Sequence, residues 1–154
     1  MLERLRRFSV LDGPAQKLFL QSLALLPLVS LSLRWSGFRA TQTALQRIFR
    51  NPLQEQNPDH VSRQIALTAH MVNAADRHGV FHPSCLAKSL TLWGLLGRQG
   101  IDSRLRIGIR KEKDNFEAHA WVEREGTALN EPEEHHRHYA AFDAAFSSQP
   151  EEKH

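Results

Sequence analysis

The hydrophobic pattern of the chain changes its period once, near Gly100. Before this point, apolar residues from Leu86 to Leu96 recur at helical spacing. After it, Leu105, Ile107 and Ile109 alternate with arginines, which is typical of a half-buried strand. Helices in the first part and strands in the second predict an α+β fold with an antiparallel sheet.

Helix signals cover the N-terminal half. Asp12-Gly13-Pro14 predicts a helix start, because aspartate caps helices and proline is tolerated in the first turn. A second helix is expected over residues 41–50. A third is expected from the cap Asp59 to about Arg77, with Gly79 as its stop. Ser84 is the natural N-cap of the helix that contains Leu86 to Leu96.

An uncharged run of sixteen residues, LFLQSLALLPLVSLSL, lies between Lys17 and Arg34. The run and the basic residues before it resemble the hydrophobic and the basic region of a signal peptide. However, Gln21 and Pro27 interrupt it, and it is shorter than the ~20 residues that span a bilayer. We expect a buried helix, kinked or broken near Pro27, and no transmembrane span.

Two further strands are expected after the first, one from about Phe116 to Glu123 and one from Thr127 to Glu131. No internal repeat is present, and the segment from Ser147 to His154 reads as disordered. We therefore divide the chain into a helical N-terminal segment (1–52), a core (53–146) and a flexible tail (147–154).

Cysteine content and charge narrow the class of protein. Cys85 is the single cysteine among 154 residues, which excludes an intramolecular disulfide and a four-cysteine zinc site and favours a reducing, cytoplasmic location. The net charge is +3, but residues 1–50 carry 8 Lys/Arg against 2 Asp/Glu. We interpret this basic half as a solvated helical face in preference to a surface for an anionic partner.

Two residues are candidates for covalent catalysis. Cys85 falls in the first turn of its expected helix, where free amide groups and the helix dipole stabilise a thiolate. His119 lies in a strand between two alanines that leave room around the imidazole. A cysteine, a histidine and a third group that orients the ring form the constellation of cysteine hydrolases and acyl transferases.

Which residue orients the His119 ring depends on the length of the turn at Glu125-Gly126. A two-residue turn would place Asn130 on the face of His119. A three-residue loop, Arg124 to Gly126, would place Glu131 opposite His119. Because a two-residue type I′ turn suits Asn or Asp better than Glu at its first position, we expect the three-residue loop and Glu131, with Asn130 in reserve.

Residues 80–131 carry a resemblance to a known family, through the segments CLAKSL from Cys85, LLGRQGID from Leu95, RIGIR from Arg106 and AHAWVE from Ala118. The chain resembles the transglutaminase-like cysteine peptidases of lasso-peptide biosynthesis, the family of the microcin J25 processing protein. The resemblance implies a transglutaminase-like or papain-like core that removes the leader from a ribosomally made precursor peptide. It also implies Cys85 as nucleophile, His119 as general base and acid, and Glu131 where the family usually has aspartate.

The same resemblance implies partners. Some members carry a fused winged-helix domain that binds the leader, and here only helical, apolar sequence precedes the core. We therefore expect leader binding by a separate winged-helix protein, and transfer of the core peptide to an ATP-dependent lasso cyclase. Acyl transfer and a non-catalytic leader-binding scaffold are the alternative functions.

No cofactor, metal or nucleic acid is expected. The histidines His135, His136 and His138 are interpreted as part of a solvated acidic segment. His78 and His82 straddle Gly79 and precede Pro83, so a shared helical face is not expected of them. The chain has no glycine-rich phosphate loop. Its strand arginines are not interleaved with aromatic residues, as they are in nucleic-acid platforms.

Overall fold

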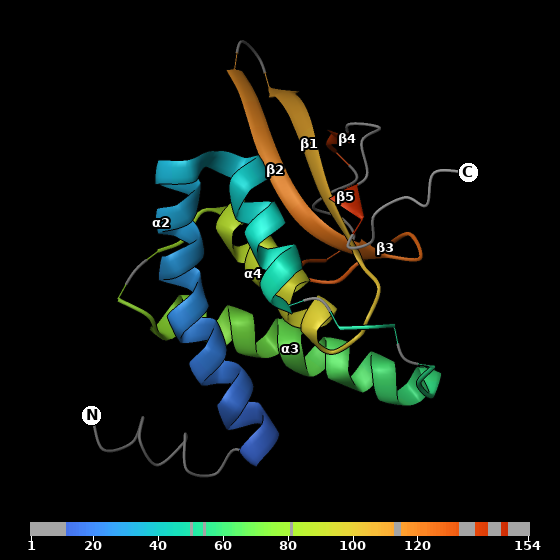
Figure 1. The fold of residues 1–154 in the computed structure, drawn as a ribbon. Coiled ribbons are helices and arrows are strands. Elements are labelled where there is room, and N and C mark those ends of the chain that lie inside the picture. The colour runs from blue at the N-terminus through green and yellow to red at the C-terminus, as the bar shows by residue number, and fades with distance from the viewer. Residues whose placement is uncertain are drawn as a thin grey trace.

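The computed structural model describes residues 12–49, 51–53, 55–80, 82–112, 115–132, 138–141 and 146–147. In these residues a group of helices packs against one face of a small antiparallel sheet (Figure 1). The predicted α+β class is therefore confirmed. The elements are α2 (Gly13–Phe49), α3 (Pro58–His78), α4 (Cys85–Arg98), β1 (Arg104–Glu112), β2 (Asn115–Arg124), β3 (Thr127–Ala128), β4 (Ala140–Ala141) and β5 (Phe146–Ser147).

Helix α2 is broken at Gly37, where φ is 78° and ψ is 178°. Figure 1 shows its first segment running along one side of the molecule, and its second segment turning back beside it. The expected break near Pro27 is wrong, because Pro27 stands inside the helix. Its ring lies on the exposed face, where the carbonyl of Leu23 that loses its helical hydrogen bond can face water.

The expectation of a buried helix holds for one face of α2 only. Leu26 and Val29 are each 3% exposed and belong to the hydrophobic core. On the opposite side of the same helix, Leu28 is 60% exposed and Trp35 is 77% exposed. The apolar run is therefore half-buried.

Helix α3 begins two residues earlier than the sequence predicts. The Asn57 side chain accepts a hydrogen bond from the Asp59 N–H at 2.9 Å, and Pro58 takes the first helical position. Asn57 is thus the cap, and the prediction of Asp59 is wrong, because the fixed φ of proline suits the first turn and not the cap. The end at Gly79 is confirmed by a 2.7 Å hydrogen bond from its N–H to the Ala75 carbonyl.

Helix α4 occupies the centre of the core. Ser84 caps it as predicted, accepting from the Ala87 N–H at 3.2 Å. Leu90, Leu92 and Leu96 are fully buried. Helix α4 packs against α2 and α3 as well as against β2, so the first residue of α4 is held in place from several sides.

The sheet has the order β3-β2-β1-β4, and β5 also pairs with β1. In the central antiparallel pair, Gly108 lies opposite His119. The expected third strand over 127–131 is too long, since only Thr127–Ala128 forms strand. Strands β4 and β5 were not predicted, and Ser147 of β5 belongs to the segment expected to be disordered.

The turn between β2 and β3 has two residues. Glu123 pairs with Ala128 and Arg124 pairs with Thr127, which leaves Glu125 and Gly126 with positive φ of 50° and 80°. The three-residue loop is therefore wrong. The register between β2 and β3 is the one that buries apolar side chains, because it pairs the buried Ala128 with Glu123 without a bulge. That preference overcomes the reluctance of a glutamate to adopt positive φ.

Candidate active site

Cys85 is the first residue of α4 and is half-buried. Its N–H lies among the unpaired amides of the first helical turn, at the positive end of the helix dipole. Among the residues that the structure describes, no group hydrogen-bonds to the thiol. The position suits a thiolate nucleophile and an adjacent oxyanion, as the sequence suggests.

His119 lies in β2 and contacts Glu131. The distance from His119 Nε2 to Glu131 Oε2 is 2.5 Å, and the side chains are 21% and 10% exposed. The other carboxylate oxygen, Oε1, is buried and has no hydrogen-bond partner within the described part of the chain. A carboxylate in this position fixes the orientation of the imidazole.

Glu131 contacts His119 from a bend that follows the hydrogen-bonded pairing of β2 with β3. The last ladder bond joins the Leu129 N–H to the Val122 carbonyl at 2.8 Å, and residues 129–131 then bend away from strand geometry. With this register, a continued strand would turn Glu131 away from the face of His119. The expected contact is thus present for a different reason than the one predicted. The catalytic roles of these residues stay predictions.

Asn130 fastens α4 to β2. Its Oδ1 accepts from the Val122 N–H at 2.9 Å, and its Nδ2 donates to Ser89 Oγ at 3.2 Å. The fully buried Ser89 hydroxyl donates to the Ala120 carbonyl at 2.8 Å. Asn130 therefore does not orient His119 in this structure, and the geometry does not support Asn130 as the alternative to Glu131.

These hydrogen bonds connect the helix that begins with Cys85 to the strand that contains His119. Ser89 lies one helical turn after Cys85, and Ala120 is the neighbour of His119 in β2. Sequence reasoning assigned no role to Ser89. A polar residue four positions after the candidate nucleophile in an apolar helix was the available signal, because buried hydroxyls need partners.

Two aromatic rings flank His119. The ring centroids of Trp121 and Tyr139 lie 6.1 Å and 5.0 Å from that of the imidazole. A side chain at Gly108 would bring a Cβ atom to 3.0 Å from both residues. Because position 108 has no side chain, Trp121 and Tyr139 can both lie close to His119, the candidate base.

An ion pair lies next to the Tyr139 ring. Arg110 contacts Glu117 at 2.6 Å, and its guanidinium lies 5.0 Å from the Tyr139 ring centroid. Hydrogen bonding to Arg110 lowers the pKa of the Glu117 carboxyl. Burial raises the pKa of the Tyr139 hydroxyl. Both groups therefore keep their ordinary charge near neutral pH.

No cluster of three or more His, Cys, Asp or Glu in the described ranges is arranged to hold a metal ion. His78, His82 and His138 are exposed. His135 and His136 lie outside the described residues.

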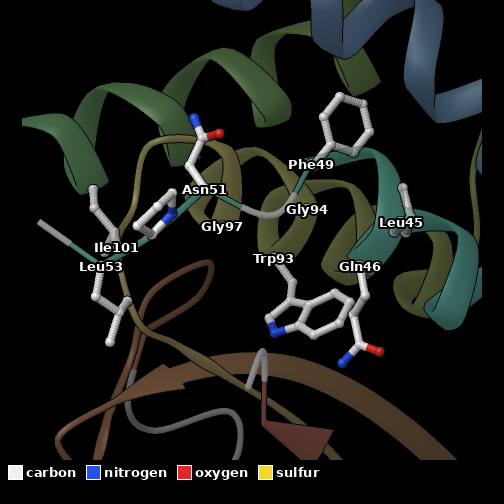
Figure 2. Close-up of a pocket in the computed structure, with 10 residues that line it drawn as sticks. Leu45, Gln46, Phe49, Asn51, Leu53, Trp93, Gly94, Gly97 and Ile101 are labelled. Carbon is white, nitrogen blue, oxygen red and sulfur yellow. The ribbon is translucent and has the colours of Figure 1, made fainter. Parts of the chain in front are cut away.

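A small apolar pocket lies away from these residues. Its volume is about 80 Å³, and Figure 2 shows it between the end of α2, residues 51–53 and α4. Trp93 lines it and donates its indole N–H to the Ser103 carbonyl at 3.2 Å. Neither Cys85 nor His119 lines this pocket, so we do not assign it to the chemistry.

Comparison with known proteins identifies the family. The family model of the transglutaminase-like superfamily matches residues 25–142, which is more than three quarters of the chain and includes Cys85, His119 and Glu131. No curated protein and no solved structure matches the chain. The chain belongs to the transglutaminase-like superfamily.

Proposed function

We propose that this protein is a cysteine peptidase that removes the leader from a ribosomally made lasso-peptide precursor. The observation that carries the proposal is the contact of Glu131 with His119, whose strand β2 is hydrogen-bonded to the helix that begins with Cys85. The resemblance of residues 80–131 to lasso-peptide leader peptidases supports the substrate class.

The pairing of Nε2 with Glu131 sets the direction of proton transfer. Because a carboxylate only accepts hydrogen bonds, Nε2 is the donor in this contact, and in the neutral imidazole Nδ1 then has the lone pair. In the proposed reaction, Nδ1 takes the Cys85 thiol proton while the sulfur attacks the carbonyl between leader and core.

The Cys85 N–H would donate to the tetrahedral oxygen. His119 would then return its proton to the leaving amine of the core peptide, and the leader would remain as a thioester on Cys85. Water, deprotonated by His119, would hydrolyse the thioester and release the leader with a free carboxylate. Glu131 would stabilise the imidazolium that forms in each half of the reaction.

The test is incubation of the protein with a candidate precursor and its leader-binding winged-helix partner, followed by mass spectrometry. We expect separate leader and core masses that sum to the precursor plus one water. A second reaction with an added primary amine distinguishes acyl transfer, which would give a leader amide in place of the acid. Persistence of the intact precursor in both reactions would contradict the proposal.

The matched control for this assay is Cys85→Ala. We expect loss of cleavage with an unchanged fold, because Ser84 still caps α4 and alanine is a strong helix former. Circular dichroism checks the fold, and pull-down with the precursor checks binding. Cleavage near the parent rate would remove Cys85 from the mechanism. Binding by both proteins without cleavage by either would favour the scaffold function.

A further inference from the structure

The outer face of α2 is apolar, although nothing in the described part of the chain covers it. Five large side chains with helical spacing lie exposed along the first segment of the helix: Leu20, Leu23, Leu28, Leu31 and Trp35. We call them the outer stripe. A helix on the surface of a soluble protein normally carries polar residues on its solvent side. An apolar stripe of this length is typical of an interaction surface.

The charges on α2 indicate what the outer stripe contacts. Every charged residue in Gly13–Phe49 is basic, and all of these residues are exposed: Lys17, Arg34, Arg39 and Arg47. Lys17 and Arg34 stand at the two ends of the stripe. An apolar face with basic ends complements the surface of an anionic lipid bilayer. The apolar side chains match its hydrocarbon, and the basic side chains match its negatively charged headgroups.

A second copy of the chain is a poorer match. Antiparallel pairing of two α2 helices would bring Lys17 of each copy to Arg34 of the other, and parallel pairing would bring each cation to itself. The helix has no carboxylate to compensate either arrangement. Like charges that face each other in this way disfavour self-association.

We propose that the outer stripe of α2 lies in the headgroup region of an anionic lipid bilayer and that the helix does not cross the bilayer. By length and composition alone, α2 could span a membrane. Crossing would remove Leu26 and Val29 from the core, where both are buried. The exposed outer stripe can enter lipid without disturbing the core, and Trp35 beside Arg34 suits the interfacial depth that tryptophan prefers.

The experiment is flotation of the full-length protein with vesicles. Vesicles of phosphatidylglycerol and phosphatidylcholine are compared with vesicles of phosphatidylcholine alone. We expect binding to the anionic vesicles that weakens as salt is added. Of the three tryptophans, Trp93 and Trp121 are each 2% exposed. A shift of tryptophan emission to shorter wavelength on binding therefore reports on Trp35.

The test variant is the double substitution Leu28→Glu with Leu31→Glu. It is expected to lower the bound fraction at least about tenfold, because it places two carboxylates in the stripe and removes two apolar side chains from lipid. Phe116→Glu is the matched control, since Phe116 is 71% exposed in β2 and lies outside the stripe. We expect it to bind vesicles like the parent protein.

Three results would overturn the proposal. The first is the absence of flotation with either kind of vesicle. The second is equal binding by the double variant, with circular dichroism showing that it is folded. The third is a lipid-free dimer, measured by light scattering, that the double variant abolishes, because that result would assign the outer stripe to a second copy.

Discussion

At the scale of single residues, Glu131 and Asn130 follow one another in the chain but contact different parts of the molecule. Glu131 contacts the imidazole of His119, and Asn130 contacts Ser89 and the backbone of β2. Glu131 thus lies against the candidate catalytic histidine, and Asn130 lies in the packing between α4 and the sheet. Substitutions at the two positions should therefore be separable by kinetics and by stability.

Glu131→Gln is expected to lower kcat on the order of 10² to 10⁴-fold with little change in KM. An amide can donate as well as accept, so it no longer enforces the proton on Nε2, and it carries no charge to stabilise the imidazolium. Steady-state kinetics on the precursor measures the effect. Parent-like kcat in Glu131→Gln would leave Cys85 and His119 as a dyad.

Asn130→Ala is expected to cost about 1–3 kcal/mol of unfolding free energy and to reduce kcat less than Glu131→Gln does. The substitution leaves the Val122 N–H and the Ser89 hydroxyl short of a partner in the interior. Urea unfolding measures the loss. In a double-mutant cycle with Ser89→Ala, the two effects should not add. The opposite kinetic ranking of Asn130→Ala and Glu131→Gln would make Asn130 the orienting group.

At the scale of elements, a backbone conformation that only glycine readily adopts sets the direction of α2. The values at Gly37 lie in a region where a Cβ atom is strained. Ser32 and Thr41 share a hydrogen bond of 2.8 Å across this break. The break allows the two segments of α2 to lie side by side and to place both Leu26 and Leu45 in the core.

Gly37→Ala is therefore expected to lower the free energy of unfolding by about 1–3 kcal/mol. Space is not the cause, because no atom lies within 4 Å of a Cβ added at Gly37. Gly13→Ala is the matched control, since it also meets no atom within 4 Å and has no positive φ. Urea unfolding of the two variants should separate them. Equal stability would show that the break tolerates a side chain.

At the scale of the whole molecule, α2 completes the core around α4. Leu26, Val29 and Leu45 of α2 belong to the same hydrophobic cluster as Leu90 and Leu96 of α4. The helix that carries Cys85 is thus held by an element far from it in sequence. The N-terminal segment is part of the folded core, in addition to presenting the outer stripe.

Deletion of residues 1–50 is expected to give an insoluble or molten protein. The deletion would expose the α4 surface that α2 now covers and would remove Leu26, Val29 and Leu45 from the core. Near-ultraviolet circular dichroism should lose its signal, and binding of a hydrophobic dye should rise. A soluble and active fragment of residues 51–154 would show that α2 is dispensable.

The sequence by itself determined the features that depend on neighbouring residues. The cap at Ser84, the end of α3 at Gly79 and the alternation from Arg104 to Arg110 each follow from a few adjacent side chains. The position of Cys85 at the start of its helix follows from the same local signals. Such features are predictable because capping and periodicity act over one or two turns.

Only the tertiary structure decided the features that depend on distant contacts. The two-residue turn at Glu125 goes against local preference because the strand register places buried residues on the sheet. The bend that brings Glu131 to His119, and the pairing of Asn130 with Ser89, require residues far apart in the chain to pack together. Local patterns carry no information on such packing, so the contact between Glu131 and His119 was expected from the sequence on the basis of a turn that the structure does not have.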